Sequence, residues 1–171
     1  MGQLMFDFEF EHIIRDSDDM NHGSGVYLWV FHADKIPPHI GISSQGKFYS
    51  LKSSGVDIGL DTGKVFRLVS DKKLPSILIR LNSKVSKAEL DRIYQGYSKT
   101  QAGSITCLTP VNEVLSIGDV AKLSELLTSL KKNGRLSQVY GFHLSAQIKG
   151  IRAYSAQDVT NRLLALQNDS K

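Results

Sequence analysis

Apolar and polar residues alternate with a period of two in much of the first half of the chain, which is typical of β-strands. Three phenylalanines within residues 6–10 alternate with acidic residues, so this segment is predicted as an amphipathic or edge strand. The runs GVYLWVFHA (25–33) and PSILIRLN (75–82) are almost entirely apolar and rich in strand-forming residues, which indicates buried strands. The alternation in KVFRLVS (64–70) is imperfect, and we predict another strand there.

A β-hairpin is predicted between two of these strands. Pro38 has no N–H to donate to a sheet, so a strand is expected to begin at the next residue, His39. The segments 39–43 and 47–52 are strand-like, and Gln45-Gly46 lies between them as a turn.

The apolar period changes to that of a helix after residue 85. Ser86 is followed three residues later by Glu89, a capping box that predicts a helix reaching about Tyr97. A second helical stretch follows Gly103, and either Thr106 or Thr109, which precedes a proline, is its expected N-cap.

Two further capping pairs predict the last helices. Ser116 with Asp119 precedes a helix over 119–132, and Ser155 with Asp158 precedes a helix over 156–167. The intervening residues, 136–154, are predicted as one or two strands. The order of elements is α+β, and we expect a central antiparallel sheet packed against helices in a single domain, 1–171.

The only cysteine, Cys107, falls at or just ahead of the predicted N-terminus of the second helical stretch. The positive end of a helix favours the thiolate, so we expect a thiol pKa below the ~8.5 of a free cysteine. Cys107 is therefore a candidate nucleophile. Ordinary core packing is the alternative, because a lone cysteine is among the most buried residue types.

His39 is the candidate general base among five histidines. It begins a short strand, follows two prolines, and is followed by Gly41, which leaves room for a neighbouring group to come close. A thiol nucleophile needs a base within hydrogen-bond reach, and the two can be distant in sequence.

Composition narrows the function classes. The 171 residues are 41% hydrophobic with a net charge of +4. The sequence has no run of five like charges, so a nucleic-acid partner is not predicted. No spacing typical of a metal site and no phosphate-binding glycine loop is present, so neither a metal nor a cofactor is predicted. One cysteine, no signal-peptide pattern and no transmembrane segment favour a cytoplasmic protein; the oligomeric state is not predicted.

The stretch PHIGISSQGKFYSL (38–51) resembles the histidine strand of the NlpC-type cell-wall peptidases. GSGVYLWVF (23–31) resembles the strand that leads into it. Here the histidine precedes the cysteine, which resembles the circularly permuted branch of the papain-like superfamily that includes the lecithin retinol acyltransferase-like proteins. The resemblance covers about 23–116 and leaves 117–171 as a helix-strand-helix extension.

The resemblance implies a cysteine hydrolase or acyltransferase that acts on a peptide amide, which is favoured, or an acyl ester. In it Cys107 is the nucleophile, His39 the base, and Ser50 the third polar residue, placed across the hairpin from His39. A serine hydroxyl orients an imidazolium weakly, so His39 is expected to keep a near-normal pKa. Asn112, Asp57 or a backbone carbonyl are other candidates for the orienting role. The alternative function is a catalytically degenerate member of the same fold that acts as a binding or interaction module.

Overall fold

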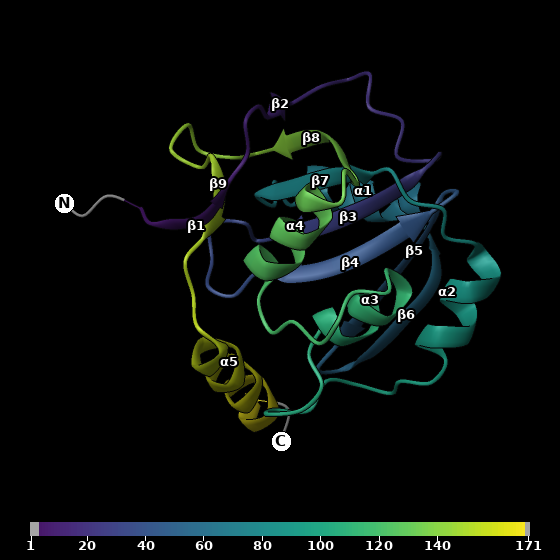
Figure 1. The fold of residues 1–171 in the computed structure, drawn as a ribbon, viewed down its shortest axis with the longest axis vertical. Helices are drawn as coiled ribbons and strands as arrows, with labels where there is room; N and C mark the ends of the chain where they lie inside the picture. The colour runs from purple at the N-terminus through teal and green to yellow at the C-terminus, as the bar shows by residue number, and fades with distance from the viewer. Residues whose placement is uncertain (1–3, 170–171) are drawn as a thin grey trace.

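A seven-stranded mixed sheet forms the centre of the structure, a computed structural model that describes residues 4–169 (Figure 1). In spatial order its strands are β2 (Ile14–Arg15), β8 (Leu136–Phe142), β7 (Ser76–Leu81), β3 (Val26–Phe31), β4 (His39–Ser44), β5 (Lys47–Lys52) and β6 (Gly55–Asp61). All neighbouring pairs are antiparallel except β2 and β8, which are parallel. The predicted α+β class and the mostly antiparallel sheet are confirmed.

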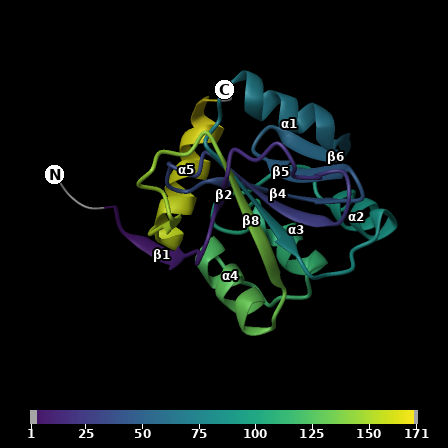
Figure 2. The same cartoon turned by 90° about the horizontal axis from the view of Figure 1, so that it is seen from above.

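Helices cover both faces of this sheet. Residues 4–169 contain five of them: α1 (Thr62–Asp71), α2 (Lys87–Tyr94), α3 (Leu108–Val114), α4 (Leu123–Lys132) and α5 (Ala156–Asp169). Figure 2 shows α1 on one side of the sheet and α3 and α4 on the other, with α5 beside one end. None of the described helices has the length and apolarity that crossing a bilayer requires.

Strand β3 divides the core into two clusters because its side chains alternate between the faces. Tyr27 and Trp29 pack with Val65 of α1, whereas Leu28 and Val30 belong to the cluster formed with α2, α3 and α4. All six residues of β3 are buried, as predicted from the apolar run.

The β4–β5 hairpin has the predicted two-residue turn. Gln45 and Gly46 both have positive φ (52° and 81°), as in the type I′ turns that match the twist of a hairpin. The predicted space at Gly41 is also used: a Cβ there would lie 2.5 Å from the ring of Phe48. The glycine therefore lets an aromatic side chain of the neighbouring strand lie over the backbone.

The segment predicted as a strand over 64–70 is instead helix α1. The Asp61 side chain accepts a hydrogen bond from the Gly63 N–H (2.9 Å) and caps the helix. Val65 and Val69 are one turn apart, and both are buried against the sheet. The helical spacing of these valines and the Asp61 cap favour a helix more strongly than the β-branched side chains favour a strand. The preceding segment, left without an element by the sequence pattern, forms strand β6.

The other predicted helix starts are confirmed in part. Ser86 Oγ accepts from the Glu89 N–H (3.1 Å), and Ser155 and Asp158 exchange two hydrogen bonds at the start of α5. Ser116 does not start a helix. Helix α4 begins at Leu123, whose N–H donates to the hydroxyl of Tyr154 (2.8 Å), so a distant side chain provides the cap.

Two strands from opposite ends of the described chain form a small separate sheet, β1 (Phe6–Glu9) and β9 (Gly150–Arg152). In β1 the phenylalanines are half-buried and the acidic residues exposed, as the alternation predicts. A Cβ on Gly150 would lie 2.0 Å from the carbonyl oxygen of Phe8, so the two backbones touch here. Strand β8, by contrast, pairs with β7 inside the main sheet, which ties the 117–171 segment to the rest of the fold.

Candidate functional site

A pocket of about 830 Å³ lies at the end of the sheet where β4 begins. Its walls come from the β3–β4 connection, strands β4 to β6, the start of α3, and one side of both α1 and α5. About half of these residues are apolar. The polar and charged lining residues are His32, Asp34, Lys35, His39, Ser50, Lys52, Ser53, Ser54, Asp57, Thr100, Thr106, Arg152, Tyr154 and Arg162, together with Cys107.

Cys107 occupies the N-cap position of α3, where the sequence placed it. Its side chain does not cap the helix. Thr106 Oγ1 accepts from the Leu108 N–H (3.1 Å), and Thr109 Oγ1 accepts from the Thr106 N–H (2.9 Å). Because neighbouring hydroxyls cap this turn, the Cys107 side chain is left to line the pocket, and it is partly exposed there.

The expected low pKa of the Cys107 thiol is wrong. Burial raises the pKa to about 11, although the N–H groups of Ile40, Cys107 and Leu108 lower it. The walls of the pocket remove most of the water that would solvate a thiolate, and this outweighs the nearby dipoles. Cys107 is therefore a protonated thiol at neutral pH.

His39 is the first residue of β4 and lies opposite Phe31 of β3, with the two rings stacked 5.8 Å apart. Burial lowers its pKa to about 4; Asp57 raises the pKa, while Lys52 and His32 lower it. The expectation of a near-normal pKa is therefore also wrong. The ring is a neutral imidazole at pH 7, the form that can accept a proton.

Ser50 lies on the same face of the sheet as His39, as predicted, but two residues away from the predicted register. The tight turn pairs Ser44 with Lys47, so Ser50 lies opposite Gly41. On its other side Ser50 pairs with Asp57 of β6. Its hydroxyl donates to Asp57 Oδ2 over 2.7 Å.

Asp57 is thus the carboxylate that acts on His39. Lys52 Nζ lies 3.1 Å from Asp57 Oδ1, so the carboxylate is held by one hydroxyl and one ammonium group. The charge of Asp57 raises the pKa of His39, whereas Ser50 donates a hydrogen bond to Asp57. The sequence named Asp57 only as one alternative, because recognising β6 was necessary to place it beside Ser50. Asn112, another alternative, donates to the Val120 carbonyl and does not line the pocket.

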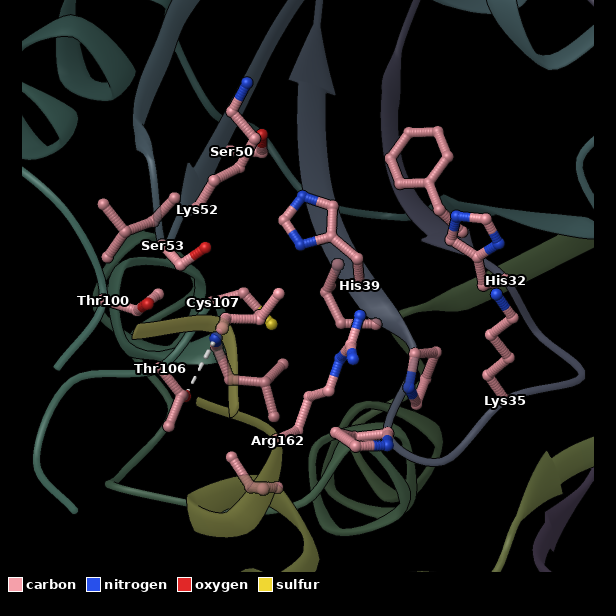
Figure 3. A pocket seen from close by; sticks show the side chains of 18 of the residues that line it. His32, Lys35, His39, Ser50, Lys52, Ser53, Thr100, Thr106, Cys107 and Arg162 are labelled. Atoms are coloured by element: carbon pink, nitrogen blue, oxygen red, sulfur yellow. Dashed lines mark hydrogen bonds between the residues drawn. The ribbon is translucent and has the colours of Figure 1, made fainter. Parts of the chain in front are cut away.

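Cys107 and His39 reach the pocket from opposite faces of the sheet. Helix α3 packs on the face that carries Ile40, while His39 stacks with Phe31 on the face that α1 covers. Both point into the cavity because it wraps around the start of β4 (Figure 3). Within residues 4–169 no hydrogen bond joins the two side chains. The backbone N–H of Ile40, the residue after His39, hydrogen-bonds to the Cys107 sulfur and lowers the thiol pKa.

No three His, Cys, Asp or Glu side chains of the described chain gather closely enough to hold a metal ion. A comparison with protein-family models, with curated proteins and with solved structures gives no match to this chain.

Proposed function

We propose that the protein is a cysteine hydrolase or acyltransferase on a permuted papain-like fold. The observation that carries the proposal is that Cys107 and His39 line one pocket, one at the start of a helix and the other at the start of a central strand. The order histidine strand, further strands, helix and cysteine helix agrees with the resemblance to permuted NlpC-type enzymes.

The protonation states define how the reaction would begin. His39 is neutral and Cys107 is protonated. Because no hydrogen bond joins the two side chains in the described chain, substrate binding would have to bring them together, and the imidazole would then take the thiol proton as the sulfur attacks the carbonyl carbon of the substrate. The imidazolium then returns the proton to the leaving amine or alcohol, which leaves a thioester on Cys107. Water, or an acceptor hydroxyl or amine, releases the acyl group in the second step. Asp57 stabilises the imidazolium in both steps.

The residues that line the pocket indicate the chemical class of the substrate. Both a peptide amide and an acyl ester fit the chemistry, and the apolar residues of the lining support an apolar group next to the bond that breaks. Phe31, Leu51 and Leu108 supply apolar surface close to the two candidate catalytic residues.

The test is to trap the acyl-enzyme. The protein is incubated with p-nitrophenyl esters of short and long acyl chains and with acylated peptides, and intact mass is measured after rapid acid quench. We expect an acyl adduct on Cys107 in the wild type, none in Cys107→Ala, and slower formation in His39→Gln. His12→Gln, at an exposed histidine outside the pocket, is the control. An adduct of equal yield in Cys107→Ala would overturn the assignment.

A binding module without catalysis is the second candidate. The raised pKa of Cys107 and the lowered pKa of His39 favour it, because neither group is ionised at rest. This candidate predicts that ligands bind the pocket with no acyl adduct under any condition, and that Cys107→Ala binds as well as the wild type.

A further inference from the structure

Three cationic side chains from separate segments line the pocket. They are Lys35 of the β3–β4 connection, Arg152 of β9 and Arg162 of α5. Burial lowers the pKa of His32, and the charges of Lys35 and Arg162 lower it further, whereas the charge of Asp34 raises it. The cations outnumber the Asp34 carboxylate, so the pocket has a net positive potential beside His32.

Asp34 offsets only part of this positive charge. Lys52 is paired with Asp57, but neither Lys35 nor Arg162 forms a salt bridge within the described residues. Arg152 Nη1 donates to the carbonyl of Asp34, whereas its Nε is buried without a hydrogen-bond partner in the part of the chain described. A buried donor without an acceptor is uncommon and costly, so an acceptor from a ligand would satisfy it.

Helix α5 presents a mixed face to the cavity. Its lining residues are spaced as one face of a helix: Val159, Arg162, Leu163 and Leu166. Arg162 is the one charge in this apolar stripe, and its guanidinium points into the cavity (Figure 3). The apolar side chains of this face can contact an apolar group of a ligand, and Arg162 between them can contact an anionic group.

We propose that the pocket binds an amphiphile whose anionic head, a carboxylate or phosphate, lies between Arg162, Arg152 and Lys35. Its apolar tail lies along the aliphatic and aromatic walls. Guanidinium groups suit this role because their fixed fork of donors matches both head groups. The inference rests on the proposed function only in using the same pocket, since binding requires no reaction at Cys107.

The experiment measures binding calorimetrically with three ten-carbon probes: decanoate, decyl phosphate and decanol. All three are titrated into Cys107→Ala as well as the wild type, so a failure of catalysis does not affect the result. We expect at least one anion to bind at least about tenfold more tightly than decanol, an electrostatic preference that weakens with added salt. The ratio between the two anions distinguishes a carboxylate site from a phosphate site.

Variants assign the preference to the named residues. Arg162→Gln should weaken binding of the preferred anion about tenfold and leave decanol unchanged, while Arg162→Lys keeps part of the preference. Arg162 is exposed, so the fold should tolerate both changes, which a melting curve checks. Arg92→Gln, on an exposed arginine of α2 outside the pocket, is the matched control. Equal binding of decanol and the anions, no binding of any probe, or equal effects of Arg162→Gln and Arg92→Gln would each overturn the proposal.

Discussion

The Ser50 hydroxyl donates a 2.7 Å hydrogen bond to Asp57 across the pair of strands β5 and β6. The bond fixes one carboxylate oxygen, and Lys52 approaches the other. Ser50 thus positions the charged group that acts on His39 and does not need to touch the imidazole itself. This arrangement replaces the direct Ser50–His39 contact that the sequence predicted.

Asp57→Asn should therefore affect His39 more than Ser50→Ala does. The Asp57 carboxylate raises the pKa of His39 against a larger opposing effect of burial, so its neutralisation should lower that pKa further. An NMR titration of the histidine ring signals checks this without a substrate. On any substrate that turns over, kcat/KM should fall at least about tenfold in Asp57→Asn and less than about threefold in Ser50→Ala. Equal effects of the two variants would contradict this hierarchy.

The labelling of Cys107 by iodoacetamide should rise steeply with pH. Burial raises the thiol pKa to about 11, so the reactive thiolate is a small fraction at pH 7 and grows about tenfold per pH unit up to pH 10. The rate is measured by quenching at intervals and counting modified protein by mass. Glutathione, a free thiol, is the control and should approach its plateau near pH 9 to 10. A plateau for Cys107 below pH 8.5 would show a thiolate at rest.

Stability should fall as the pH is lowered from about 6.5 to about 4. Burial lowers the folded-state pKa of His39 to about 4, so in this window the unfolded chain binds a proton that the folded protein does not. One such group contributes at most about 1.4 kcal/mol per pH unit to the free energy of unfolding. Urea denaturation at several pH values measures the slope.

The slope should be smaller in His39→Gln than in the wild type. It should not vanish, because burial also lowers the pKa of His22 and His32. His12→Gln changes an exposed histidine and should leave the slope as it is. A slope unchanged by His39→Gln would mean that this imidazole titrates normally in the folded protein.

Gly41→Ala should destabilise the hairpin that carries His39. The new methyl group would lie 2.5 Å from the Phe48 ring and 3.0 Å from the Tyr49 carbonyl oxygen, so buried neighbours must move. We expect a loss of about 2 kcal/mol or more in unfolding free energy. Gly118→Ala, where no atom lies within 4 Å of the added methyl group, should change stability by less than about 0.5 kcal/mol. Chemical denaturation compares the two variants, and similar losses would contradict the packing argument.

The sequence predicted elements well where the signal was local. The buried strand β3, the hairpin turn at Gln45-Gly46 and the caps at Ser86 and Ser155 all depend on a few adjacent residues. Helix α4 was misplaced at its start because its cap is the hydroxyl of Tyr154, which no local pattern reveals. Helix α1 was read as a strand because its β-branched residues have a high strand propensity.

The candidate site shows the same limit. Motif and order were enough to single out Cys107 and His39, and the structure places both at one pocket. Their ionisation could not be predicted, since it depends on how much water the surrounding walls exclude. The partner of Ser50 required the register of β6, and the cations of β9 and α5 come from segments that share no motif with the histidine strand.

The pairing of β1 with β9 has a consequence for how the molecule folds. The two strands are almost as far apart in sequence as the described chain allows, and closing so long a loop carries a high entropic cost. Strand β9 carries Arg152 and leads directly into α5, which carries Arg162. We therefore expect the consecutive strands β3 to β6, which include His39, to form first, while the cationic wall takes its place only in the last stage of folding.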